Sequence, residues 1–264
     1  MSASDKLYVP PRLSTSLVRA SLYILVVFAI SMGSVLGTGV SLRAFIEGIP
    51  SMFRLAAEMW PPDFARRAAI GRALLTTIQI AIAGTSAGLC LSILAGVLAS
   101  NRQSPSPWLR SVVTMVLAGV RTVPELLWAL IFVVSVGPGA FAGVLAICMD
   151  TLGFAGRFYA EALDEIDQGP QATLQIHGAS RLLVLLGGVF PKAFPSLLHT
   201  SLYSLERAVR ASVVLGLVGA GGIGIELKVA MELFDYRRAS AMVICILAVV
   251  VLVEAIGAWL RRRY

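Results

Sequence analysis

Uncharged apolar runs of membrane-spanning length recur along this chain. Residues 20–42 and 73–101 contain no charged side chain, and a helix that crosses a bilayer needs about 20 apolar residues. Further apolar runs lie at about 108–135, 141–158, 192–217 and 239–260. The pattern predicts an all-α, polytopic transmembrane helical bundle with about six spans. Within the second run, small residues at four-residue spacing predict a helix-packing face: Gly84, Gly88, Ser92 and Gly96.

Proline and glycine interrupt the apolar runs at two places. Pro124 lies inside the third run, and because proline lacks an N–H we expect it to kink that helix. The glycine-dense segment 216–224 should break the fifth run. A polar loop is expected at 226–238, before the last span.

The first 70 residues differ in pattern from the rest. Residues 43–71 mix charged and apolar side chains at roughly helical spacing and include Trp60. This favours an interfacial amphipathic segment with Trp60 at headgroup level, and a helix in a soluble loop is the alternative. The first apolar run is longer than the hydrophobic part of a signal peptide and is expected to be retained. We therefore predict a single transmembrane domain, in which 1–70 form a tail, first helix and interfacial segment and 71–264 form the core.

Composition agrees with a membrane protein. The chain is 57% hydrophobic and 14% charged, with a mean hydropathy of +0.82, whereas a soluble domain carries about 25% charged residues. The net charge is +7, but the basic residues lie between apolar runs. They favour headgroup contact, topology and an anionic cargo over a nucleic-acid partner. The cysteines and histidines lack metal-ligand spacing, and neither a P-loop nor paired catalytic groups are present, which argues against a membrane enzyme.

Charge gives little information about orientation. With six spans and both ends inside, Lys and Arg divide almost evenly between the two sides. The run of arginines at 261–263, next to the last span, favours a cytoplasmic C-terminus. We expect both termini to be cytoplasmic.

Charged residues inside predicted spans are candidates for function. Arg121 lies four residues before Glu125, and Glu206 lies four residues before Arg210, a spacing that places each pair on one helical face. Two interpretations are open. The members of each pair neutralise each other and have a structural role, or the two arginines, together with Arg207, line the path of an anion. The second is chemically reasonable because a guanidinium donates bidentate hydrogen bonds to oxyanions. Asp150 and Glu254 are assigned no role.

The polar segment 161–191 carries a recognisable spacing. Gly178 and Pro191 stand thirteen residues apart, and two short helices joined by a turn near Gly178 would fit. This segment resembles the cytoplasmic EAA loop of ABC-importer permeases, in which Glu-Ala-Ala precedes the glycine. Here Ala172, Thr173 and Leu174 occupy those three positions, so the glutamate is missing, and Gly188 stands where isoleucine is usual.

Three further stretches resemble phosphonate permeases of this family: 121–126 (Arg-Thr-Val-Pro-Glu-Leu), the turn at 137–143, and the glycine-rich segment 215–224. Methionine-type permeases share the last of these. The resemblance covers about residues 70–264. It implies a type I, methionine-permease-like fold in the cell (inner) membrane.

The resemblance also implies a function and partners. The chain would be the membrane-spanning subunit of an ATP-driven importer that moves phosphonate, or a related small oxyanion, by alternating access. Its partners would be two ATP-binding subunits that carry ATP and Mg, a periplasmic or lipid-anchored phosphonate-binding protein, and a second permease copy or a similar chain. No cofactor is expected in this chain. Phosphate, phosphite or methionine are alternative cargoes, and a self-contained secondary transporter or channel is the alternative from another class.

Two sets of site residues follow. The ATPase-coupling loop would use Ala172, Thr173, Leu174, Gly178, Ala179 and Pro191. The translocation path or gate would use Arg121, Pro124, Glu125, Glu206, Arg207, Arg210, Gly221 and Gly222. For Gly221 and Gly222 two interpretations are open, a flexible gate lined by backbone or close packing of helices.

Overall fold

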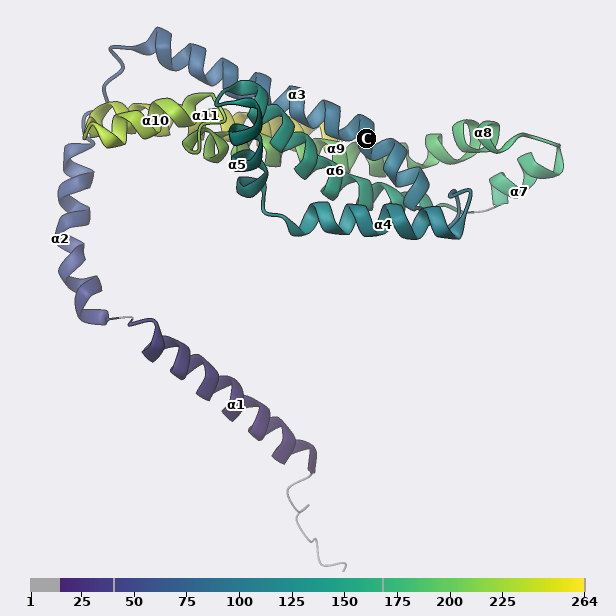
Figure 1. The fold of residues 1–264 in the computed structure, drawn as a ribbon, viewed down its shortest axis with the longest axis horizontal. Helices are drawn as coiled ribbons and strands as arrows, with labels where there is room; N and C mark the ends of the chain where they lie inside the picture. The colour runs from purple at the N-terminus through teal and green to yellow at the C-terminus, as the bar shows by residue number, and fades with distance from the viewer. Residues whose placement is uncertain (1–14, 40, 168, 264) are drawn as a thin grey trace, which may run out of the picture. The chain divides into compact units, whose positions relative to one another are not determined.

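The computed structural model describes residues 15–39, 41–167 and 169–263, and all regular structure in these residues is helical (Figure 1). The chain separates into two compact units, residues 1–57 and 58–264. The first contains α1 (Thr15–Gly37) and nearly all of α2 (Leu42–Glu58). The second contains α3 (Arg67–Ala99), α4 (Pro107–Thr122), α5 (Glu125–Val136), α6 (Ala140–Asp164), α7 (Gly169–Ile176), α8 (Arg181–Val184), a π-helical turn (Leu185–Val189), α9 (Phe190–Leu217), α10 (Ile223–Glu232) and α11 (Tyr236–Arg261).

The two helices of the first unit expose their apolar residues. The apolar part of α1, Arg19–Gly37, is long enough to cross a membrane and buries none of its length. The helix α2 buries no residue and exposes Phe45, Ile46 and Phe53, while Arg43 and Glu47 form an ion pair of 2.7 Å along its polar side. The amphipathic helix predicted from the sequence is therefore present, and its place at the membrane interface stays a prediction.

The predicted number of spans is confirmed. Five helical segments of the described residues are long and apolar enough to cross a membrane, and the bent pair of α4 and α5 raises the number to six if it counts as one span. The core of the second unit forms where α3, α6 and α9 pack together around Ile80, Ile147 and Leu215. A second core cluster lies where the start of α9 meets the end of α6.

The small residues of α3 allow a close contact with α6. Gly84, Gly88, Ser92 and Gly96 are all buried. A Cβ atom at Gly84 would lie 2.7 Å from the Cβ of Ile147, and one at Gly88 would lie 2.6 Å from the Cβ of Thr151. Real Cβ contacts are not this short, so glycine is required for the two backbones to approach. The packing face predicted from the four-residue spacing is confirmed.

The third apolar run is not one kinked helix, as predicted, but two helices at an angle of 89°. Proline disfavours helical angles at the residue before it, and Val123 is extended (φ −81°, ψ 118°). The helix α4 therefore ends at Thr122, and α5 begins after Pro124. The indole of Trp128 bridges the corner by donating to the carbonyl of Val120 (3.3 Å).

Two boundaries in the second half also differ from the prediction. The fifth span begins at Arg181 rather than near Lys192, because α8, the π-helical turn and α9 run on as one helix of 37 residues. The wider π-helical turn ends two residues before Pro191, which has no N–H to continue a regular ladder of hydrogen bonds. The predicted loop at 226–238 is largely the helix α10, whose polar residues lie on its outer side while Ile223 and Ala230 are buried.

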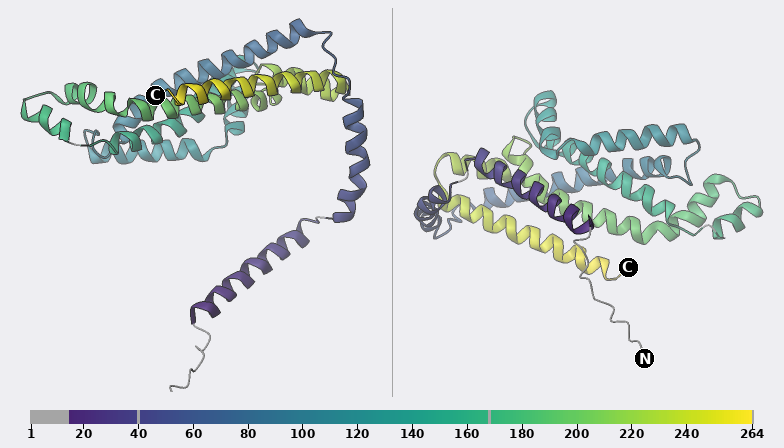
Figure 2. Two further views of the ribbon diagram at one scale, coloured as in Figure 1. Left: turned by 180° about the vertical axis from the view of Figure 1, so that it is seen from behind. Right: turned by 90° about the horizontal axis from the view of Figure 1, so that it is seen from below.

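The second unit has two distinct ends. The helices α7 and α8 lie beyond the ends of α3 and α4, whereas α10 and the beginning of α11 lie at the opposite end (Figures 1 and 2). The end that carries α7 and α8 is the one predicted to be cytoplasmic.

Candidate translocation path and coupling loop

The predicted coupling loop contains the two short helices expected from its sequence. The helix α7 ends with a paired set of hydrogen bonds, from Ala179 N–H to the carbonyl of Leu174 (3.0 Å) and from Gly178 N–H to the carbonyl of Gln175 (3.0 Å). This arrangement needs a left-handed residue after the helix, and Gly178 supplies it with φ +81°. Ser180 then caps α8 by accepting a hydrogen bond from Leu183 N–H (3.4 Å).

The departures from the EAA pattern compensate each other. Leu174 stands where the pattern has its second alanine, and a Cβ at Gly188 would lie 3.0 Å from the Cδ1 atom of Leu174. A larger side chain in the loop therefore packs against a smaller residue in the π-helical turn before α9. Ala172, Thr173 and Pro191 are exposed, while Leu174 and Ala179 pack partly on the second core cluster. The loop presents a small, partly exposed surface at the end of the bundle.

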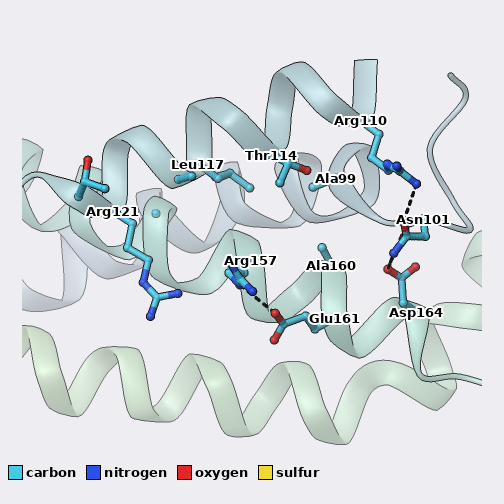
Figure 3. A pocket seen from close by; sticks show the side chains of 13 residues that line it. Ala99, Asn101, Arg110, Thr114, Leu117, Arg121, Arg157, Ala160, Glu161 and Asp164 are labelled. Atoms are coloured by element: carbon cyan, nitrogen blue, oxygen red, sulfur yellow. Dashed lines mark hydrogen bonds and ion pairs between the residues drawn. The ribbon is translucent and has the colours of Figure 1, made fainter. Parts of the chain in front are cut away.

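A cavity of about 560 Å³ lies between α4, α6 and the end of α3 (Figure 3). Its lining includes three arginines, Arg110, Arg121 and Arg157, and two carboxylates, Glu161 and Asp164. Sequence analysis predicted only Arg121 among these, because the cavity forms where helices meet, and spacing along the chain does not show which side chains line it.

Four of the five charged groups in the cavity are engaged. Asp164 accepts hydrogen bonds from Ser100 Oγ (2.6 Å), Asn101 N (3.0 Å) and Asn101 Nδ2 (2.9 Å), and so ties α6 to the end of α3. The other side of the Asn101 amide accepts from Arg110 (2.5 Å). Arg157 and Glu161 form an ion pair of 2.8 Å along α6.

Arg121 differs from these groups. In the part of the chain that the structure describes, its guanidinium has no hydrogen-bond or ion-pair partner. The predicted pair with Glu125 is wrong, because the 89° bend separates α4 from α5 and the two residues share no helical face. Glu125 is half-buried at the start of α5, within electrostatic range of Asp150 and Arg207.

The charged residues of α9 pair with other helices rather than with each other. Arg207 pairs with Asp150 of α6 and lies 4.8 Å above the ring of Phe154. Arg210 pairs with Glu254 of α11. The predicted Glu206–Arg210 pair is therefore wrong.

Glu206 instead accepts from Arg261 at 2.5 Å, and its side chain is only 8% exposed. Asp150, Glu254 and Arg261 were missed as partners because a sequence shows neighbours along one helix and not those on the next.

The glycine-rich segment 216–224 packs closely against another turn. Gly139 N–H donates to the carbonyl of Gly219 (2.9 Å), and a Cβ at Gly221 would lie 2.9 Å from the backbone nitrogen of Ala140. Gly221 and Gly222 adopt left-handed angles, φ +89° and +73°. The hydroxyl of Thr77 then accepts from Ile223 N–H (2.8 Å) and so caps α10. Close packing is thus present, while a gating role stays a prediction.

Comparison with known proteins identifies the architecture. Residues 88–264 match the family described as binding-protein-dependent transport system inner membrane component. The chain belongs to this family. Its fold is similar to that of the MetNI methionine ABC transporter, with a TM-score of 0.65 at 19% identity over 76% of this chain and 98% of that chain. The predicted ABC-importer permease in the inner membrane is confirmed, which sets aside a self-contained transporter.

Curated relatives of this permease come from several importers. The phosphite transport system permease protein PtxC of Stutzerimonas stutzeri is 37% identical over 83% of this chain and 80% of its own length. The phosphate-import permease protein PhnE of Mycolicibacterium smegmatis is 37% identical over 78% of this chain, which spans only 39% of that protein. The probable D-methionine permease protein MetI of Vibrio cholerae is 28% identical over 71% of this chain.

Proposed function

We propose that this permease imports a small phosphorus oxyanion of the phosphonate or phosphite class. The observation that carries the proposal is the similarity to the phosphite permease PtxC, which extends over most of both chains. The similarity to the D-methionine permease is weaker and covers less of this chain. Relatives named for phosphite, phosphate and phosphonate transport share one chemical feature of their cargo, a compact group with several anionic oxygens.

The side chains on the proposed path suit such a cargo. A small anion that leaves water is strongly penalised unless fixed donors replace its hydration. Guanidinium groups donate two parallel hydrogen bonds to an oxyanion, and arginines line the cavity between α4 and α6. In this proposal Arg121 contacts the cargo, whereas Arg207 and Arg210 hold the helices together through their carboxylate partners.

The energy source would be a separate pair of ATP-binding subunits with ATP and Mg. The loop from α7 to α8 would receive them, because it projects from one end of the bundle and ends α7 with a fixed glycine turn (Figure 1). A second permease copy, or a similar chain, would complete the path. A periplasmic or lipid-anchored binding protein would deliver the oxyanion at the opposite end.

Reconstitution tests this function. The permease, purified with the ATP-binding subunit and binding protein that accompany it, is placed in liposomes loaded with ATP and Mg. We expect uptake of methylphosphonate or phosphite that requires both partners and stops with a non-hydrolysable nucleotide. Uptake of D-methionine with no uptake of any phosphorus oxyanion would show that the proposed cargo is wrong. Uptake without the ATP-binding subunit would contradict the proposed coupling.

A further inference from the structure

We propose that the cavity between α4 and α6 is a weak transit site for the oxyanion at the coupling-loop end of the permease. Arg121 and Arg157 would bind the anion, and Glu161 would compete with it for Arg157. This inference rests on the proposed function and adds to it the residues that hold the cargo and the one that promotes its release.

The position of the cavity suits the last part of an inward path. Its lining includes Ala99 and Asn101 at the end of α3 and Asp164 at the end of α6 (Figure 3), and α7 is the next helix along the chain. One water molecule occupies about 30 Å³ in the liquid. A cavity of about 560 Å³ therefore has room for a small oxyanion together with much of its hydration shell.

Close packing of α4 on α6 directs Arg121 to this place. A Cβ at Gly153 would lie 3.1 Å from the backbone nitrogen of Arg121, so the absence of a side chain lets the end of α4 approach α6. Since α4 stops at Thr122, the guanidinium extends from the last turn of the helix into the cavity (Figure 3). Thr122 also contributes to the lining.

The availability of Arg121 distinguishes it from the arginines of α9 and α11. Arg207, Arg210 and Arg261 are each paired with a carboxylate on another helix. An anion that approached one of them would have to displace that carboxylate and separate two helices. In the described residues Arg121 carries no such partner, so binding an anion there disrupts no helix contact.

The ion pair between Arg157 and Glu161 can be broken at little cost in stability. The two side chains are 59% and 48% exposed and lie on one helix at a spacing of four residues, and an exposed pair of this kind contributes little to stability. An oxyanion can therefore replace Glu161 as the partner of Arg157 without disrupting a contact between helices. When the anion leaves, Glu161 returns to Arg157, which prevents tight retention of the cargo.

The remaining charges of the cavity stay engaged during this exchange. Asp164 is held by the hydrogen bonds of Ser100 and Asn101, and Arg110 is held by Asn101. They form the wall of the cavity next to the loop. A phospholipid headgroup offers the same phosphate chemistry, so the experiment must distinguish a free oxyanion from lipid.

Protection of a cysteine from modification tests the site without transport. Cys90, Cys148 and Cys245 are replaced by alanine, and Thr114→Cys is introduced in the cavity lining. The assembled transporter in detergent reacts with an anionic thiol reagent in methylphosphonate or phosphite, or in chloride at equal ionic strength. We expect the oxyanions, but not chloride, to slow the reaction severalfold.

Arginine variants then assign the protection to its residues. Arg121→Gln and Arg157→Gln should each abolish it, and Arg121→Lys should retain part of it. Glu161→Gln should lower the concentration for half-protection by about two- to fivefold, the range expected for removing an exposed competing ion pair. Arg72→Gln is the matched control, because Arg72 is an exposed arginine of α3 that lies outside this cavity. It should leave protection unchanged, and size-exclusion profiles verify assembly of every variant.

The possible outcomes test the transit site and the proposed function independently. If the complex imports methylphosphonate, but Thr114→Cys is not protected or stays protected in both glutamine variants, the transit site is wrong and the proposed function stands. If Thr114→Cys is protected through both arginines but no oxyanion is imported, the site stands and the function is wrong. If nanodiscs with anionic phospholipid slow the reaction and free oxyanion adds nothing, the cavity binds lipid phosphate and the proposal is overturned.

Discussion

The ion pair between Glu206 and Arg261 joins α9 to α11, and its contribution to the stability of the protein can be predicted from its burial. The Glu206 side chain is 8% exposed and that of Arg261 is 28% exposed, with 2.5 Å between Oε1 and Nη1. Gly257 leaves the space for this carboxylate, since a Cβ there would collide with it. The change to make is Arg261→Met, which keeps much of the side-chain volume and removes the charge.

The expected cost follows from burial. Breaking a buried ion pair by removing one partner costs about 3–5 kcal/mol, because the other charge is left without compensation. Arg261 is partly exposed, so we expect the lower end, about 3 kcal/mol. For a domain of roughly this size, 1 kcal/mol lowers the melting temperature by about 2–4 °C, which gives a decrease of about 6–12 °C.

Removing both charges should restore most of the stability. The double variant Glu206→Leu with Arg261→Met leaves no unpaired charge, and replacing a buried pair by apolar residues is often neutral. Thermal unfolding of the four proteins in one detergent gives a coupling energy, which we expect at about 2–3 kcal/mol. The matched cycle with Glu206→Leu and Arg210→Met should give less than about 0.5 kcal/mol. Strong coupling of Glu206 to Arg210, and none to Arg261, would refute the pairing described for α9.

Three further predictions concern packing, coupling and topology. Gly88→Ala should lower the melting temperature, because overpacking the α3–α6 contact costs about 1–3 kcal/mol. In the control Gly119→Ala an added Cβ meets nothing within 4 Å, so the melting temperature should rise slightly through a gain in helix propensity of about 0.5–1 kcal/mol. Equal shifts in the two variants would contradict the packing argument. Gly178→Leu should leave the protein inserted but lower transport and ATPase stimulation. The backbone at Gly178 has a φ of +81°, and a residue with a side chain adopts such an angle at a cost of about 1–2 kcal/mol. Normal ATPase stimulation would show that this turn is not needed for coupling. A cysteine at Ser104 should resist an impermeant thiol reagent added outside intact cells while one at Ser51 should react, and the reverse result would invert the predicted orientation.

The parts of the fold that sequence predicts well are those governed by local chemistry. Apolar run length identified the spans, and four-residue spacing identified the face of α3 that contacts α6. The left-handed turn at Gly178 followed from glycine at a motif position. In each case one helix or one turn contains all the information that the prediction uses.

The parts that sequence did not predict depend on contacts between helices. Arg210 has a carboxylate four residues before it, yet its partner is Glu254, because α11 lies against the same face of α9. Arg121 lies in the last turn of α4 because the chain at 123–124 ends that helix with a sharp turn rather than a kink. Spacing along one helix cannot show which neighbour presents a closer charge, and for that reason both predicted i, i+4 pairs failed.

The continuous helix from Arg181 to Leu217 has a mechanical consequence. At 1.5 Å per residue its 37 residues extend about 55 Å, from the coupling loop to the glycine-rich turn. Ion pairs bind it to α6 and α11 along the way, so we expect these three helices to tilt together. A tilt of about 10° at the loop then displaces the far end by about 10 Å. In the proposed mechanism, a small movement of an ATPase partner at the coupling loop would therefore be transmitted along α9 to the glycine-rich turn at 218–222, where that helix ends.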